Sequence, residues 1–169
     1  MAGITSYPTS PAIGFAGQLV DVSPHFIASA INREVAPIPF GVALKKGTNE
    51  DEALLPVATT DVLAGIAVHR HDVNTIGSSA WSTAAGIPVG DRFDLLKEGV
   101  IYVKVEEAVV QGDKAFVRFL TGAGGTQLGA WRKSADTATA RAVNGAYFLK
   151  GAAAGGIAPL YFNFAVAAG

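Results

Sequence analysis

The heptapeptide IAVHRHD, residues 66 to 72, carries the residue types with the most obvious chemistry in this chain. In an extended strand the side chains alternate between faces, so His69 and His71 would stand on one side, roughly 7 Å apart. Neutral imidazole is a common metal ligand, but a working site needs three or four convergent donors, and the only other histidine is His25. A strand with outward polar side chains is the favoured interpretation. A metal-dependent hydrolase using His69, His71 and Asp72 is an alternative.

Other catalytic or cofactor-binding patterns fail on spacing. Gly122-x-Gly124 is followed by Gln127 where a dinucleotide-binding loop needs glycine, and no Gly-Lys-Ser/Thr sequence occurs. The chain has no Gly-x-Ser-x-Gly nucleophile elbow. Glu106 and Glu107 are adjacent, so on a strand they would point to opposite faces and would not form a facing carboxylate pair. The sequence therefore predicts no enzymatic activity and no cofactor.

The charge of the chain argues against a nucleic-acid partner. Its 169 residues include 13 basic and 14 acidic side chains, a net charge of -1, without a long block of either sign. Neutralising phosphates requires a clustered basic face. Charged residues make up only 16% of the chain, against about 25% in typical soluble domains, which favours a surface partly covered by other subunits. We expect a homo-oligomer, a dimer or trimer, with an Ala-rich monomer as the alternative.

Cysteine usage and the two termini limit where the chain is expected to act. There is no cysteine, which excludes disulfides and thiolate sites and is consistent with assembly in a reducing cytoplasm. The N-terminal MAGITSYPTSPAIGFAGQ lacks the pattern of a signal peptide. The C-terminal GAAAGGIAPLYFNFAVAAG is uncharged, but its glycines and proline would interrupt a helix, and Leu160 and Phe162 alternate with Tyr161 and Asn163. We predict a terminal strand and no membrane segment.

The remaining pattern is typical of an all-β protein. Short apolar runs are punctuated by Gly, Pro, Asn and Asp at intervals of roughly 8 to 15 residues, which predicts a jelly-roll-like β-sandwich or barrel. Residues 1–16 are expected to form an extended N-terminal arm and residues 17–169 a single β domain. The predicted strands are 17–22, 40–45, 54–58, 65–72, 92–97, 99–106, 114–120, 142–148 and 160–166.

Several local features refine this prediction. In GVIYVKVEE, Ile101, Val103 and Val105 would share the buried face of the strand. PVGDRF and VQGDKAFVRF each place Gly-Asp before an alternating run, as expected of a tight turn that leads into a strand. Residues 23–31, SPHFIASAI, fit either a short helix or an extended segment. Trp81 and Trp131 are expected to be packed, with an aromatic anchor at a subunit interface as the alternative.

The order of five stretches resembles the capsid cement, or head decoration, proteins of tailed bacteriophages. The stretches are AGQLVD, IPFGVALKKGT, LPVATTDVLAGIAVHRHD, EGVIYVKVEEAVVQGDKAFVRF and LGAWRKSADTATARAVNGAYFLKGAAAGGIAPLYFNF. The likeness is one of layout and covers nearly the whole chain, except for residues 74–88, which do not align. It implies a jelly-roll-like domain that binds the outside of an HK97-type phage head and bridges neighbouring major capsid subunits without chemistry.

A cement protein of this kind would reside on the exterior of the virion after assembly in the host cytoplasm. Many weak contacts repeated over a lattice suffice for attachment, because simultaneous engagement raises the effective affinity. The residues expected to touch the capsid or a neighbouring subunit are Tyr7, Pro8 and Pro11 of the arm, Trp81, and Tyr161, Phe162 and Phe164 of the last strand. Core packing is the alternative for the last strand, and a tail-associated receptor- or glycan-binding β-sandwich is the alternative function.

Overall fold

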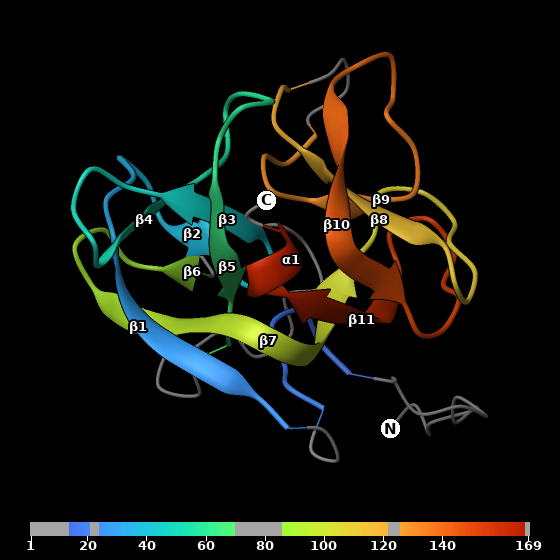
Figure 1. The fold of residues 1–169 in the computed structure, drawn as a ribbon, viewed down its shortest axis with the longest axis horizontal. Coiled ribbons are helices and arrows are strands. Elements are labelled where there is room, and N and C mark those ends of the chain that lie inside the picture. Colours follow the sequence, from blue (N-terminus) through green and yellow to red (C-terminus); the bar gives the residue numbers. More distant parts are fainter. Residues whose placement is uncertain (1–13, 21–23, 70–85, 122–125, 168–169) are drawn as a thin grey trace, which may run out of the picture.

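The computed structural model describes residues 14–20, 24–69, 86–121 and 126–167 (Figure 1). Over these residues the regular secondary structure is β-strand apart from one four-residue helical turn, and none of the helices described is long and apolar enough to cross a membrane. The elements are β1 (Phe26–Asn32), β2 (Ile38–Pro39), β3 (Ala43–Lys46), β4 (Glu52–Leu54), β5 (Leu63–Ala67), β6 (Gly86–Ile87), β7 (Arg92–Lys104), β8 (Lys114–Arg118), β9 (Trp131–Arg132), β10 (Ala140–Phe148), β11 (Ile157–Asn163) and the single turn α1 (Phe164–Ala167).

The first lobe is a closed β-barrel built from the N-terminal half of the chain. Its strands pair in the order β1, β4, β3, β5 and β7, and β7 pairs again with β1 to complete the ring. The parallel pair is β1 with β4, and the other pairs of the ring are antiparallel. The small sheet of β2 and β6 adds two fully buried side chains to the core. That core consists of Ala30, Ile38, Phe40, Val42, Leu44, Ala53, Ala64, Ala67, Ile87, Phe93 and Leu95.

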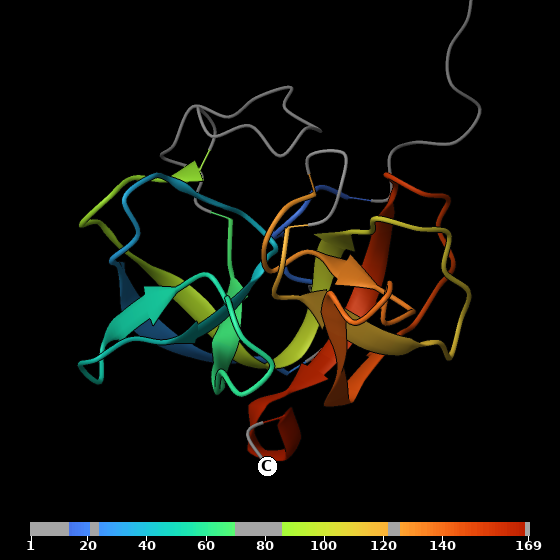
Figure 2. The same ribbon diagram turned by 90° about the horizontal axis from the view of Figure 1, so that it is seen from above.

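The second lobe continues from the same strand β7 into the C-terminal half of the chain. Here β7 pairs with β11, followed in order by β10, β8 and β9. A single bridge between Val105 and Trp131 connects β9 back to the end of β7. The two lobes lie side by side, with β7 passing beneath both of them (Figure 2). The 13-residue strand β7 is therefore shared by both lobes.

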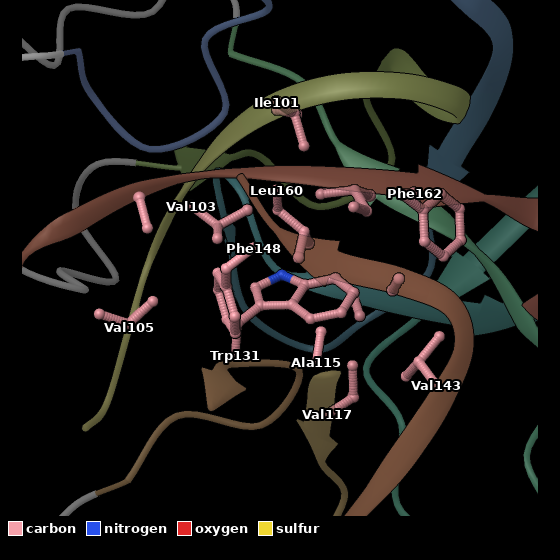
Figure 3. Close-up of a cluster of buried hydrophobic side chains, with 14 of the residues drawn as sticks. Ile101, Val103, Val105, Ala115, Val117, Trp131, Val143, Phe148, Leu160 and Phe162 are labelled. Atoms are coloured by element: carbon pink, nitrogen blue, oxygen red, sulfur yellow. The ribbon is translucent and has the colours of Figure 1, made fainter. Parts of the chain in front are cut away.

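Trp131 lies in the core of the second lobe, among aliphatic and aromatic side chains of β7, β8, β10 and β11 (Figure 3). It is fully buried, and its ring meets that of Phe162 edge-on at a centroid distance of 6.3 Å. The indole Nε1–H donates to the carbonyl of Gly41, 2.9 Å away in the first lobe. Arg141 of β10 also reaches the first lobe, where it donates to the carbonyls of Thr59 and Asp61. Both residues therefore fasten the two lobes together.

The predicted all-β fold of sandwich or barrel type is confirmed, with a closed barrel and further strands beside it. Ile101, Val103 and Val105 are fully buried, as the alternation in this strand predicts. Trp131 is packed, as expected, and residues 26–32 adopt the extended alternative. Both Gly-Asp pairs form turns before strands, because Gly90 (φ 80°) and Gly112 (φ 86°) adopt left-handed conformations.

Several predicted boundaries differ from the structure. The two strands predicted at 92–97 and 99–106 are one strand, β7, because Gly99 does not end it but pairs with Phe162 of β11. The last strand ends at Asn163, and the chain then turns into α1 instead of extending to residue 166. The strand predicted at 54–58 is displaced to 52–54, before Pro56, which has no N–H to donate to a ladder.

Candidate functional site

The histidine motif is only partly within the described residues, since His71 and Asp72 lie outside them. His69 follows β5, and its backbone N–H donates to the carbonyl of Gly17 at 2.9 Å. Its ring packs between Phe15 and Phe40, with centroid distances of 4.5 and 4.6 Å. In the described ranges no cluster of three or more His, Cys, Asp or Glu is placed to hold a metal ion. These contacts give His69 a packing role between the first lobe and the N-terminal segment.

The residues at the C-terminal end of the expected N-terminal arm are hydrogen-bonded to β7, the strand that both lobes share. Residues 14–20 run along β7, where Gly17 N–H donates to the carbonyl of Tyr102 at 2.8 Å and Tyr102 N–H donates to the carbonyl of Gln18 at 2.8 Å. Gly14 lies so close to the ring of Tyr102 that a Cβ added there would be 2.7 Å from it. The predicted contact residues Tyr7, Pro8 and Pro11 lie outside the described residues, as does Trp81.

The aromatic residues of the C-terminal strand have different surroundings. Phe162 is fully buried in the core of the second lobe, and Phe164 packs against that core beneath Lys97, whose Nζ lies 4.3 Å from the centre of its ring. Tyr161 is only half-buried, and its ring lies 5.2 Å from that of Tyr147, which is 42% exposed. β11 pairs with β7 along its length and with β10 at Leu160 and Tyr161. Core packing therefore accounts for Phe162, while Tyr161 is available at the surface.

A shallow groove lies on the outer side of β1, β7 and β11. It has a volume of about 420 Å³ and is lined by Pro24, His25, Phe26, Glu98, Gly99, Val100 and Tyr161. Gly99 has a φ of 136°, and a Cβ there would lie 2.9 Å from the carbonyl of Pro24. Only glycine therefore lets residues 24–25 cross the strand so closely and form one wall of the groove. Phe26 is 62% exposed at its rim.

The second lobe contains an ionic cluster that the sequence analysis did not predict. Arg118 is only 1% exposed, and its Nε lies 2.8 Å from both carboxylate oxygens of Glu106. Its Nη2 donates to Asp136 at 2.6 Å, and its Nη1 donates to Thr139 at 2.7 Å. Arg132 donates to the same two carboxylates, at 3.1 Å for Glu106 and 2.7 Å for Asp136. The two guanidinium groups thus pair with Glu106 below the surface and with Asp136 at the surface.

The cluster holds an exposed loop in a strained conformation. Asp136, Thr137 and Ala138 have φ angles of 45°, 53° and 65°, in the left-handed region that residues other than glycine rarely enter. Three such residues in succession persist only where surrounding contacts impose the conformation. Here the imposing contacts are the bonds from Arg118 and Arg132 to the Asp136 carboxylate. These bonds therefore hold the turn at residues 136–139 in its left-handed conformation.

Two carboxyl groups in and beside the cluster, those of Asp136 and Glu107, have lowered pKa values. The hydrogen bond from Arg118 is the largest contribution that holds the pKa of Asp136 below its ordinary value. For Glu107, burial alone would raise the pKa, but hydrogen bonds from Ser134 and from the backbone of Lys133 outweigh it and lower the pKa. Both carboxylates are thus stabilised in the charged form.

The sequence offered no signal for this cluster. Arg118 and Glu106 occupy polar positions near the ends of predicted strands, where exposure is the normal expectation. Twelve residues separate them, and Arg132 follows at a further fourteen, so local spacing does not indicate that they meet.

The geometry describes an all-β protein of two fused barrel-like lobes, with a groove lined by Phe26 and Tyr161 and a turn at residues 136–139 on its surface. The chain belongs to the phage family described as "Structural cement protein (E217 gp24/Pam3 gp6)", whose model matches residues 4–163. A chain of the solved structure "The capsid of Myoviridae Phage XM1" shares the fold, with a TM-score of 0.70 and 21% identity over 96% of this chain and 98% of that chain. No curated protein matches the sequence significantly. The resemblance seen in the sequence is confirmed, and the protein is a structural component of a phage capsid.

Proposed function

We propose that this protein binds the outer surface of an HK97-type phage head and bridges neighbouring major capsid subunits, thereby stabilising the shell. The observation that carries this proposal is the family match over residues 4–163, because the family is structural and not enzymatic. The same match favours the capsid over a tail-associated role and over hydrolysis. We place the protein on the virion exterior, assembled in the host cytoplasm.

The two-lobed architecture supports a bridging role. A bridge must resist being pulled apart between its two contact points, and here one strand, β7, runs through both lobes. Trp131 and Arg141 add hydrogen bonds from the second lobe to the carbonyls of Gly41 and Thr59 in the first. The two lobes therefore act as a single unit that resists separation of the two capsid subunits it bridges.

The contacts themselves are proposed from the exposed aromatic residues and the arm. Tyr7, Pro8, Pro11 and Trp81 remain candidates for capsid or subunit contact. Tyr161 joins them from the surface, while Phe162 and Phe164 support the strand that presents it. We also propose a homo-oligomer, since low charge and exposed apolar residues such as Val35 and Tyr147 favour coverage by neighbours.

The test is co-sedimentation of the purified protein with matching phage heads that lack it. Saturable binding at a fixed ratio to the major capsid protein, together with increased survival of the heads on heating, is the expected result. The oligomeric state follows from analytical ultracentrifugation of the free protein. Absence of binding to mature heads would contradict the proposal.

A further inference from the structure

The groove over β7 combines a carboxylate with aromatic rings in one row of strand partners. In the antiparallel register Glu98 lies opposite Phe26 of β1 on one side and opposite Asn163 of β11 on the other. Tyr161 lies two residues from Asn163 on β11 and lines the same groove. Neighbouring strands are about 4.8 Å apart, so all of these side chains fall within reach of one bound group.

The carboxylate of Glu98 is held in place by neutral donors. Its Oε1 accepts hydrogen bonds from the Tyr161 hydroxyl at 3.3 Å and from Asn163 Nδ2 at 3.1 Å. Within the described part of the chain, no lysine, arginine or histidine forms an ion pair with it. The nearest lysine in sequence, Lys97, is directed to the other side of the strand, where it donates to the carbonyl of Ala64 at 2.6 Å. Glu98 thus presents an oriented negative charge at the surface.

The surroundings of this charge suit a cation that also has an apolar surface. Phe26 and Tyr161 line the groove from the two strands that flank Glu98, and cations bind favourably over the faces of aromatic rings. A guanidinium group is planar, weakly hydrated and able to stack on an aromatic ring while donating to a carboxylate. A purely apolar occupant would leave the carboxylate of Glu98 buried without a counter-charge, which is costly.

We propose that this groove binds a basic side chain, arginine above all, presented by the capsid protein to which this chain attaches. The inference rests on the proposed cement function and identifies one contact through which it is exerted. Glu98 supplies the counter-charge, Phe26 and Tyr161 supply the stacking surfaces, and Asn163 and the Tyr161 hydroxyl position the carboxylate.

The first experiment measures saturation binding of variants to heads that lack the protein. Glu98→Gln keeps the shape of the side chain but removes its charge, and we expect binding to weaken by about tenfold to a hundredfold, since a charge-assisted hydrogen bond is lost. Phe26→Ala removes one stacking face, for which we expect a reduction of about twofold to fivefold. Asp94→Asn is the matched control, because Asp94 is an exposed carboxylate on the same strand outside the groove, and its binding should equal that of the wild type.

Unchanged binding of Glu98→Gln, with wild-type protein bound normally, would overturn this inference and leave the cement function intact. Failure of the wild type itself to bind would overturn both. A second experiment places a photo-crosslinking amino acid at Phe26 and identifies the captured peptide on assembled heads. A capsid-protein peptide with arginine or lysine beside the crosslink is expected, whereas capture of another copy of this chain would show a self-association surface and contradict the inference.

Discussion

The two lobes share strand β7, but they differ in how their strands close the barrel and in which side chains form their cores. In the first lobe paired strands close the whole ring, and the largest buried side chains of its core are Phe40 and Phe93. The second is completed only by the single bridge between Val105 and Trp131, and a whole indole fits inside it.

Their buried polar groups differ as well. In the first lobe the neutral amide of Asn32, 0% exposed, donates to the carbonyls of Ile87 at 2.8 Å and Pro88 at 3.1 Å. In the second lobe two guanidinium groups and their carboxylates fix the loop around Asp136. A neutral anchor is insensitive to pH and salt, while a charged one is not. The second lobe is therefore where stability should respond most to mutation and to conditions.

The largest expected loss of stability comes from removing the indole of Trp131 from the core of the second lobe. Trp131→Ala should lower the free energy of unfolding by about 4 kcal/mol, because a buried indole is replaced by a cavity and the bond to Gly41 is lost. Chemical denaturation monitored by circular dichroism measures it. Trp131→Phe, which keeps an aromatic ring but not the N–H, should cost less than half as much. A loss of under 1 kcal/mol for Trp131→Ala would show that this core does not hold the lobe together.

The ionic cluster gives the next largest effect. Arg118→Met should cost about 3 kcal/mol, since it leaves the buried carboxylate of Glu106 without its main partner. The double variant Arg118→Met with Glu106→Gln should recover part of this loss, because the unpaired charge is then absent. Urea titrations of the three proteins provide the double-mutant comparison. An unchanged stability of Arg118→Met would contradict the assigned role of the cluster.

The two Gly-Asp turns allow a direct comparison between the lobes. Gly90 precedes β7 and Gly112 precedes β8, both have positive φ angles, and a Cβ at either position would have nothing within 4 Å. Gly90→Ala and Gly112→Ala should therefore each cost about 1 kcal/mol, from backbone strain alone. Thermal melts of the two variants test for equal losses. Clearly unequal losses would show that one turn contributes contacts that the other lacks.

The smallest effect concerns acid. The pKa values of Asp136 and Glu107 are lowered in the folded protein, so their contribution to stability is present above the ordinary carboxyl pKa of about 4 and is lost as the pH falls through the lower folded values. The wild type should lose stability below about pH 4 more steeply than Asp136→Asn. The difference should be small because Asp136 is exposed. Parallel slopes for the two proteins would contradict this assignment.

The family and the fold class were accessible from the sequence, but the surface sites were accessible only in part. The alternation in β7 and β11 predicted the buried faces correctly, and the Gly-Asp pairs marked both turns. Among the residues expected to touch partners, Tyr161 lies at the groove, but nothing in its neighbourhood along the chain indicated Glu98 or Phe26. Nothing in the pattern of residues 114–120 indicated that Arg118 is buried.

The sequence by itself determined the local properties of this protein: strands where apolar residues alternate, turns where glycine permits a positive φ, and an uncharged C-terminus that forms a strand. These follow from the sterics of neighbouring residues. The tertiary structure alone decided that β7 serves two lobes, that Arg118 meets Glu106 and Arg132, and that Phe26, Glu98 and Tyr161 line one groove. These contacts depend on which strands pair although they lie far apart in the sequence. The alternation of side chains along one strand does not indicate which strand will pair with it.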